Sequence, residues 1–228
     1  MKSNIAFIIP VYNEAQVIGN VVNRVLKKYE YVVCVNDGST DSSADEIEKT
    51  KAYLVNHPIN MGQGAALQTG IDFALTNKNI KYFVTYDADG QHQIEDVDNM
   101  LSYISKHGDV DIILGSRFLG SAVNIRPLKK IILKLAVKFS NASTGIKLTD
   151  THNGLRVFNR KVAEGLQLKM ADFAHASEII DRIAEKTWAY KELPVTIVYS
   201  DYSTGKGQSM INAINIGFDI LLRKIIGK

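Results

Sequence analysis

The sequence has few of the features that would place it outside the ordinary soluble globular class. Cys34 is the only cysteine among 228 residues, which excludes an intrachain disulfide. It lies in the apolar run Tyr31–Val35, so we expect it to be buried. No stretch has the roughly 20 uninterrupted apolar residues that span a bilayer, and residues 1–10 lack the long apolar stretch of a signal peptide. We therefore expect a cytoplasmic protein.

Acidic residues are absent from one long internal segment. From Ile112 to Thr149 the sequence has no Asp or Glu. The segment is either a solvated basic face or a surface that meets anions, such as phosphates or lipid headgroups. The net charge of +3 is too small to indicate a nucleic-acid partner. The basic residues of the segment are Arg117, Arg126, Lys129, Lys130, Lys134, Lys138 and Lys147.

The first half of the chain alternates between short apolar runs and segments with helical spacing. Strands separated by helices need crossover connections, which predicts an α/β fold with a mostly parallel, Rossmann-like sheet and helices on both faces. The predicted strands are Asn4–Pro10, Tyr31–Val35, Ala52–Val55, Tyr82–Tyr86 and Asp111–Leu114. The predicted helices are Glu14–Lys28, Asp41–Lys49, Ala65–Leu75 and Ile94–Ser105.

The second half is less regular. Strands are predicted at Gly154–Asn159 and Lys191–Tyr199, with a helix at Ala174–Lys186 between them. The chain has no internal repeat, low-complexity tract or Pro/Gly linker, so we expect one domain over residues 1–228.

Two amphipathic helices are predicted in the second half. One runs from Arg126 to Phe139 and has four lysines on its polar arc. The other has apolar residues at helical spacing from Ile211 to Ile225, with Arg223, Lys224 and Lys228 late in the segment. Such a stripe usually packs on the core, but basic amphipathic helices also lie in membrane interfaces. The pattern leaves both alternatives open.

Three acid-bearing turns follow predicted strands. They are Pro10-Val11-Tyr12-Asn13-Glu14, Asn36-Asp37-Gly38-Ser39-Thr40-Asp41 and Asp87-Ala88-Asp89-Gly90-Gln91-His92. Ligands bind outside the carboxyl ends of the strands in open α/β sheets. We therefore expect the three turns to converge on one crevice.

Asp87 and Asp89 form a D-x-D pair at a strand end. Mg²⁺ and Mn²⁺ prefer oxygen ligands and leave coordination positions for substrate phosphate. One carboxylate together with Gln91 or His92 would leave room for both oxygens of a diphosphate. The alternative is an Asx turn at the start of a loop, which the pair alone does not exclude.

Three further segments carry polar chemistry. Asn60–Gly70 is a Gly-rich helix entry that either presents backbone N–H groups to phosphate or packs a helix closely on the sheet. Gly115–Phe118 would end a strand, where Arg117 could clamp a diphosphate. Asp150–Arg156 contains an acid, two polar side chains and an Arg that either line an acceptor site or cap a loop.

Taken together, these motifs resemble glycosyltransferase family 2, which has the GT-A fold. The likeness is closer to the branch that contains dolichyl-phosphate mannosyltransferases and polyprenyl-phosphate glycosyltransferases. It extends from Pro10 to about Lys206. The motifs are PVYNE, NDGSTD, NMGQGAALQTG, DADGQH, GSRF, DTHNGLR and the late Lys206, in the family's order.

The resemblance implies a set of site residues and two functional halves. Residues 1–117 would bind the nucleotide-sugar, and residues 118–228 would form the acceptor side. The base and ribose would be held by Pro10, Tyr12, Glu14, Val35 and Asp37. The metal and diphosphate would be held by Asp87, Ala88, Asp89 and Gln91. Phosphate charge would be neutralised by Arg117 and Lys206, and Glu178 falls where the family carries an acid near the acceptor.

The implied reaction is an inverting, metal-dependent transfer of a hexose from a nucleotide diphosphate-sugar. Its expected catalytic residues are Asp89, Arg117, Glu178 and Asp150. A polyprenyl phosphate acceptor is already an anion and needs no general base. A glycan hydroxyl does need one, and Glu178 and Asp150 are the candidates for that alternative.

The sequence departs from the branch at two places. An Arg often precedes the late Lys in the family, but Ser200 and Asp201 stand near that position. Many relatives also add C-terminal transmembrane helices, and this chain has an amphipathic segment there. A peripheral location at the inner membrane face is expected, with a membrane surface, a membrane-protein partner or a second copy of the chain as partners. A nucleotide-sugar-binding subunit that serves such a partner is the remaining alternative.

Overall fold

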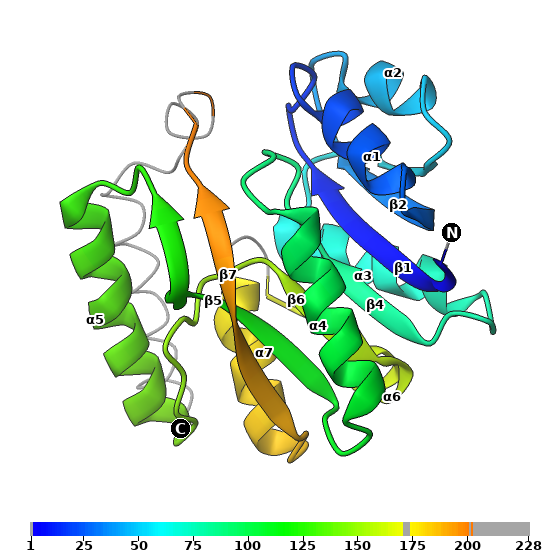
Figure 1. Ribbon diagram of the computed structural model, residues 1–228. Helices are drawn as coiled ribbons and strands as arrows, with labels where there is room; N and C mark the ends of the chain where they lie inside the picture. Colours follow the sequence, from blue (N-terminus) through cyan, green and yellow to red (C-terminus); the bar gives the residue numbers. More distant parts are fainter. Residues whose placement is uncertain (1, 171–173, 201, 203–228) are drawn as a thin grey trace.

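The computed structural model describes residues 2–170, 174–200 and 202, and its strands form one seven-stranded sheet (Figure 1). The strands lie in the order β3-β2-β1-β4-β6-β5-β7. Their bounds are β1 Lys2–Val11, β2 Tyr29–Asp37, β3 Tyr53–His57, β4 Tyr82–Thr85, β5 Ile112–Val123, β6 Arg156–Asn159 and β7 Tyr190–Val198.

The sheet is mostly parallel, as the sequence predicted. β1 pairs in parallel with β2 and β4, β2 with β3, and β5 with β7. The exception is β6, which lies antiparallel between β4 and β5. Because β1, β2 and β4 run the same way, their carboxyl ends lie at one edge, and the three acid-bearing turns leave the sheet there.

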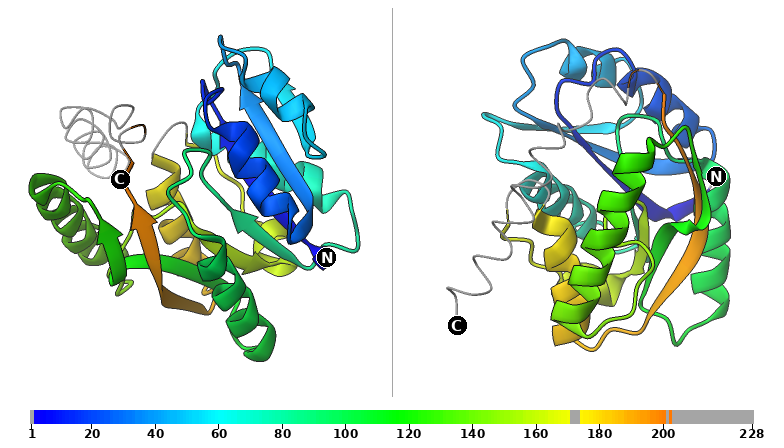
Figure 2. Two further views of the ribbon diagram at one scale, coloured as in Figure 1. Left: turned by 45° about the horizontal axis from the view of Figure 1, so that its top comes forward. Right: turned by 90° about the vertical axis from the view of Figure 1, so that its left-hand side faces the viewer.

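Helices cover both faces of the sheet, and alternate strand residues supply the two cores (Figure 2). Phe7 and Ile9 of β1 pack in one cluster, whereas Ala6 and Ile8 pack in the other. The first cluster includes residues of α1 (Ile18–Leu26), α2 (Ser43–Glu48) and α4 (Ile94–Lys106). The second includes residues of α3 (Gln63–Leu75), α6 (Arg160–Gly165) and α7 (Ala174–Glu185). Cys34 is buried in the first cluster, as expected.

Two predicted boundaries are wrong for identifiable reasons. The first helix begins at Ile18 rather than Glu14, because Asn13 has a φ of +56° and the residues after it bond to the loop that follows β2. The strand predicted at Asp111–Leu114 continues to Val123, because its second half pairs with β7. The short helix α6 was not predicted; Asn159 caps it by accepting a hydrogen bond from the Val162 N–H.

The predicted helix from Arg126 to Phe139 is present as α5, Pro127–Thr144. Pro127 stands in its first turn, and Gly145 ends it in the left-handed conformation with a φ of +73°. Its apolar stripe faces outward: Leu128, Ile131, Leu135 and Phe139 are 51%, 56%, 59% and 40% exposed. The buried residues of α5 are Val137 and Ser140.

The second amphipathic segment and Lys206 lie outside the described residues. Among the helices that the structure does describe, none combines the length and the apolar character needed to cross a bilayer.

Candidate functional site

The turns after β1 and β2 interlock through side-chain hydrogen bonds. The Thr40 N–H donates to Asn13 Oδ1 over 2.8 Å, and the Asn13 N–H donates to Ser39 Oγ over 2.9 Å. The Glu14 N–H donates to Ser43 Oγ over 2.7 Å. These bonds let Asn13 adopt its positive φ and fix Glu14 at the edge of the sheet. The PVYNE and NDGSTD motifs therefore form one structural unit.

Asp37 is buried and holds the entry to α3. It accepts hydrogen bonds from the Met61 N–H (2.9 Å) and the Gly62 N–H (2.8 Å), and its Oδ1 lies 2.7 Å from His57 Nδ1. These N–H groups belong to the Gly-rich segment, for which the sequence left phosphate binding and close packing as alternatives. An internal carboxylate already binds them, which favours the packing interpretation of this segment.

The glycines of the same segment allow close packing. A Cβ at Gly70 would collide with Ile8 and lie 3.2 Å from Val35 Cγ2, and a Cβ at Gly64 would collide with the Met170 carbonyl. Gly62, with a φ of +92°, supplies the turn that precedes α3. Because Gly70 has no side chain, α3 can lie against β1 and β2, and because Gly64 has none, the chain at Met170 can approach α3.

The other expected nucleotide ligands lie at the same edge. Pro10 and Val35 are buried and face each other across β1 and β2. Tyr12 is 47% exposed. Glu14 accepts a 2.6 Å hydrogen bond from the Tyr202 hydroxyl, a contact between the first turn and the segment after β7 that the sequence analysis missed. The assignment of these residues to base and ribose stays a prediction.

The two acids of the DADGQH turn have different surroundings. Asp87 Oδ2 lies 2.9 Å from His92 Nε2, and Gln63 Nε2 lies 3.4 Å from Oδ1. The carboxylate also packs directly on Gly154, where a Cβ would lie 2.5 Å from Oδ1 and closer still to Oδ2. Asp89 bonds within its own turn, accepting from the backbone N–H of Gln91 at 3.0 Å and from the Gln91 side-chain amide.

These surroundings shift the two pKa values in opposite directions. Burial raises the pKa of Asp87, but the attraction of His92, Arg156 and His175 outweighs burial and the net shift is downward. Burial, followed by repulsion from Asp87, raises the pKa of Asp89 to about 6. The pair therefore contains one carboxylate whose charge is stabilised by cationic neighbours and one whose charge is disfavoured by burial and by the other acid.

The residues of this turn suit a divalent cation that takes few protein ligands. Among the described residues, no group of three or more His, Cys, Asp and Glu side chains could enclose a metal ion. Mg²⁺ and Mn²⁺ are, however, commonly held by one or two carboxylates plus substrate phosphates and water. A cation at Asp89 would stabilise the charged carboxylate that burial, and then repulsion from Asp87, disfavour. Asp89, with Gln91 and Asp87 beside it, therefore fits such an ion.

Arg117 lies inside β5, not at a strand end as the sequence suggested. The β5–β7 pairing is irregular between Ser116 and Ser121, so Arg117 lies where the regular register of the two strands is interrupted. Arg117 is buried. Its Nε donates to Asp150 Oδ2 (2.6 Å), its Nη1 to the Tyr199 hydroxyl (2.6 Å) and its Nη2 to the His152 carbonyl (3.0 Å).

The two candidate general bases are both engaged by protein groups. Asp150 is buried, pairs with Arg117 and also accepts the Arg117 N–H at 3.0 Å. Glu178 is buried on α7 and accepts the N–H groups of Lys169 (3.0 Å) and Met170 (2.9 Å). Their catalytic roles stay predictions, and the structure shows that each also stabilises the fold.

Sequence reasoning missed one polar residue near the site, Lys129, whereas it named Asn153 and Arg156 within the DTHNGLR motif. Lys129, assigned to the basic arc of the helix, is half-buried, and its Nζ lies 4.6 Å from the centroid of the Tyr199 ring. In the part of the chain that the structure describes, Arg156 Nη1 and Asn153 Nδ2 are buried without a hydrogen-bond partner. Burial lowers the pKa of Arg156 to about 10, against the attraction of Asp87 and Asp150.

Electrostatic coupling joins these groups into one site. The negative charge of Glu14 adds to the upward shift in the pKa of Asp89. Asp89 in turn opposes the fall in the pKa of Lys129 that burial and Arg117 cause. The first turn, which interlocks with the turn after β2, therefore lies near the DADGQH turn, as the strand-end argument predicted, and the start of α5 lies beside them. The motif DTHNGLR surrounds Asp87 from the other side through Gly154 and Arg156.

Comparison with known proteins agrees with this arrangement. Residues 6–166 match the sequence pattern of glycosyl transferase family 2. An uncharacterised protein of Methanocaldococcus jannaschii is 32% identical over 229 residues, covering 98% of this chain and 93% of that protein. The UDP-N-acetylglucosamine–dolichyl-phosphate N-acetylglucosaminyltransferase of Methanococcus voltae is 28% identical, covering 97% and 96%. The polyprenol monophosphomannose synthase of Mycolicibacterium smegmatis is 27% identical, covering 87% and 79%.

Solved structures show the same architecture. The glucosyl-3-phosphoglycerate synthase of Mycobacterium tuberculosis, crystallised with Mn²⁺, UDP-glucose and phosphoglyceric acid, aligns with a TM-score of 0.70 at 14% identity, covering 99% of this chain and 80% of that one. A mycobacterial protein aligns with a TM-score of 0.72 at 15% identity, covering 92% and 70%. These likenesses confirm the predicted GT-A fold. With that fold, its D-x-D turn at the edge of the sheet and the matching sequence pattern, the chain belongs to glycosyl transferase family 2.

Proposed function

We propose that this glycosyltransferase transfers a hexose from a nucleotide diphosphate-sugar to a polyprenyl phosphate, with inversion at the anomeric carbon. The observation that carries the proposal is the gathering of acidic and cationic side chains in one site. The D-x-D turn supplies the carboxylates of Asp87 and Asp89, and the buried Arg117 and half-buried Lys129 supply positive charge that is coupled to them. Such a site suits a metal-bound diphosphate beside a second anionic group.

The donor would bind along the edge formed by β1, β2 and β4. Tyr12 and Glu14 present an exposed ring and a carboxylate there for the base and ribose. Asp89 and Gln91 would hold Mg²⁺ or Mn²⁺ against the diphosphate. When bound, the metal would balance the negative charge that develops on the departing nucleotide. Lys206 would add to this balance, but it lies outside the described residues.

The state of the two candidate bases supports a phosphate acceptor over a hydroxyl. A sugar hydroxyl must lose its proton during transfer, so its acceptor site needs a base within hydrogen-bond reach. Asp150 is already paired with Arg117, and Glu178 already accepts two backbone N–H groups. A phosphate acceptor is an anion before it binds and needs neither. Relatives of this chain carry names that include dolichyl phosphate, polyprenol monophosphomannose and undecaprenyl phosphate.

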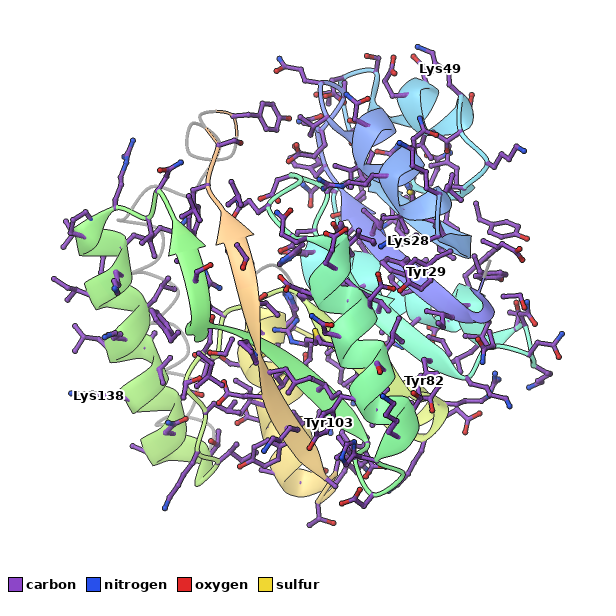
Figure 3. The ribbon with its side chains drawn as sticks, in the orientation of Figure 1. Lys28, Tyr29, Lys49, Tyr82, Tyr103 and Lys138 are labelled. Carbon is purple, nitrogen blue, oxygen red and sulfur yellow. The ribbon has the colours of Figure 1, made fainter. Side chains whose placement is uncertain are left out.

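A lipid-linked acceptor requires the enzyme to reach a membrane surface, and we place that contact on α5. Its exposed stripe of Leu128, Ile131, Leu135 and Phe139 is accompanied by the exposed Lys130, Lys134 and Lys138. Lys138 projects from α5 away from the sheet (Figure 3). Lys129 extends from the same helix toward Tyr199. One helix would thus contact the bilayer on one face and the reaction site on the other.

Transfer assays test this proposal directly. Purified protein is incubated with Mn²⁺ and a panel of radiolabelled UDP- and GDP-hexoses, with undecaprenyl phosphate in detergent micelles as acceptor. We expect one donor to yield label in the organic phase, and we expect chelator to abolish the transfer. A parallel reaction offers a soluble oligosaccharide in place of the lipid. Transfer to the oligosaccharide alone would identify a hydroxyl acceptor, and donor binding without transfer or hydrolysis would identify a binding subunit.

A further inference from the structure

Tyr199 contacts two cations through different parts of its side chain. Its hydroxyl accepts a 2.6 Å hydrogen bond from Arg117 Nη1. The Nζ of Lys129 lies over its ring, 4.6 Å from the centroid. Tyr199 itself is buried, directly after the end of β7, and its N–H donates to the Val123 carbonyl at the end of β5. Its ring therefore has a fixed position between the bulge of β5 and the first turn of α5.

The two cations are close enough to repel each other. Burial, followed by the charge of Arg117, lowers the pKa of Lys129. Asp150 neutralises Arg117, and among the ion pairs of the described residues none involves Lys129. The negative ring face of Tyr199 attracts the Lys129 ammonium without neutralising it. The result is a pair of cations of which Arg117 has a carboxylate partner in hydrogen-bond contact, whereas Lys129, among the described residues, has only the more distant charge of Asp89.

We infer that Tyr199 is a positioning residue that holds Arg117 and Lys129 together as one oxyanion-binding pair. Its hydroxyl fixes the orientation of the guanidinium, and its ring fixes the ammonium beside it. The inference rests on the proposed function only in taking the oxyanion to be a phosphate of the substrates.

Among the described residues, no other aromatic side chain contacts both cations. An aliphatic residue at this position could replace neither contact. Without the ring, the flexible Lys129 side chain would lose its position over the site, and its ammonium would turn to water. Without the hydroxyl, Arg117 would keep Asp150 but lose the contact that orients Nη1. Oxyanion binding should therefore depend on Tyr199 even though its side chain carries no charge.

Inorganic pyrophosphate is the probe that separates the two contacts. Its binding to the full chain is measured by calorimetry, with Mg²⁺ in fixed excess. We expect Tyr199→Phe, which keeps the ring, to weaken binding about threefold through the lost hydrogen bond to Arg117. Tyr199→Leu, which removes both contacts, should weaken it on the order of tenfold or more.

A double-mutant comparison with Lys129 distinguishes positioning from a purely structural role of Tyr199. A purely structural role would leave the effect of Lys129→Ala on pyrophosphate affinity the same in every background. Lys129→Ala should weaken pyrophosphate binding by the same factor in wild type and in Tyr199→Phe, where the ring remains. In the Tyr199→Leu background the same substitution should have little further effect, because Lys129 is already displaced. Equal effects of Lys129→Ala in all three backgrounds would overturn the inference, as would wild-type binding in Tyr199→Leu or no binding in wild type.

A matched control is available in Tyr29, whose hydroxyl donates a 2.6 Å hydrogen bond to Asp98 (Figure 3). Tyr29→Phe removes a buried tyrosine hydroxyl away from the site. It should lower the melting temperature without changing pyrophosphate binding. Sugar transfer is measured separately on the same samples. Pyrophosphate binding with the expected coupling but without transfer would contradict the proposed function and leave the role of Tyr199 intact.

Discussion

At the scale of single residues, the structure separates the two acids of the D-x-D pair by their neighbours. Asp87 is held by His92, Gln63 and Gly154, whereas Asp89 bonds only within its own turn among the contacts described. The neighbours of Asp87 lower its pKa, whereas burial and then repulsion from Asp87 raise the pKa of Asp89. Asp87 is thus preorganised by the fold, and a metal ion at Asp89 would stabilise the charged form that burial disfavours.

The first prediction follows for Asp89. Asp89→Ala should remove the main carboxylate of the metal site, so Mn²⁺ binding in the presence of nucleoside diphosphate should weaken on the order of 100-fold. The fold should remain, because a strand-end turn is not core. Electron paramagnetic resonance measures free Mn²⁺, and Asp72→Ala on the exposed face of α3 is the control. Unchanged Mn²⁺ binding in Asp89→Ala would refute this metal site.

The second prediction concerns Gly154. Gly154→Ala would place a methyl group against both oxygens of Asp87, so the carboxylate must move. A displacement of about 1 Å near the reacting groups can lower the rate by on the order of 100-fold. We therefore expect a large loss of transfer rate with a small change in melting temperature. Gly108→Ala is the matched control, because a Cβ there meets nothing within 4 Å. Wild-type rates in both variants would show that Gly154 does not set the position of Asp87.

At the scale of elements, α5 carries the third prediction. Each lysine near an anionic membrane contributes roughly 1 kcal/mol to binding, and salt screens the effect. Changing Lys130, Lys134 and Lys138 to Gln should lower the partition coefficient onto anionic liposomes, measured by co-sedimentation at low salt, by on the order of 100-fold. A triple Gln variant of the exposed Lys51, Lys78 and Lys106 is the control. If both triple variants sediment like the wild type, α5 is not the membrane contact.

The fourth prediction concerns Asp111, at the junction of β5, β6 and β7. It accepts hydrogen bonds from Lys161 Nζ (2.9 Å), Asn159 Nδ2 (3.0 Å) and the Ala189 N–H (3.1 Å). Burial raises the pKa of Asp111, but these donors outweigh burial and the net shift is downward. Because the folded pKa lies below the unfolded value, the contribution to stability is present above that value and is lost as the pH falls through the folded pKa.

Asp111→Asn should therefore lower the free energy of unfolding at pH 7 by about 1–2 kcal/mol. The difference from wild type should begin to shrink as the pH falls below about 4, where the carboxyl of the unfolded chain takes up a proton before that of the folded chain does. Urea titrations at pH 7, 5 and 3.5 measure this trend. Asp109→Asn, at an exposed position two residues earlier, should show no such dependence. A constant difference at all three pH values would contradict the role of the charge.

At the scale of the whole molecule, the pair of Arg117 and Asp150 joins three segments that are far apart in the chain. Arg117 comes from β5, Asp150 from the loop before β6, and Tyr199 follows β7. The end of β7 also contacts the D-x-D turn, since the Val198 N–H donates to the Gln91 carbonyl at 3.1 Å. One continuous set of contacts therefore fixes the D-x-D turn relative to Arg117, Asp150 and Tyr199.

The fifth prediction tests this network. Asp150→Ala leaves a buried guanidinium without its carboxylate, which should lower the free energy of unfolding by about 3–5 kcal/mol. Adding Arg117→Met should recover a large part of that loss, because the second substitution removes the unpaired charge. Denaturant unfolding measures both variants. Equal stability of Asp150→Ala and wild type would show that Asp150 is available for another role, such as a general base.

The sequence by itself determined the alternation of strands and helices and the convergence of the three acid-bearing turns. Both follow from local patterns: apolar runs, helical spacing and the rule that parallel strands end at one edge. It also determined the family, because motifs such as DADGQH and NDGSTD are contiguous in the chain. Helix boundaries near Glu14 were less predictable, because they depend on side chains about 25 residues away.

The tertiary structure alone decided which polar side chains are available for chemistry. Nothing local shows that Asp37 holds the entry to α3, that Asp150 neutralises Arg117, or that Glu178 accepts two backbone N–H groups. The role of Tyr199 was equally hidden, because its two partners are 82 and 70 positions away in the chain. The identity of an Asp, an Arg or a Tyr in the sequence does not reveal whether its side chain is hydrogen-bonded or ion-paired in the folded protein. Its charge and its hydrogen bonds are set by groups that only the folded chain brings within a few ångströms.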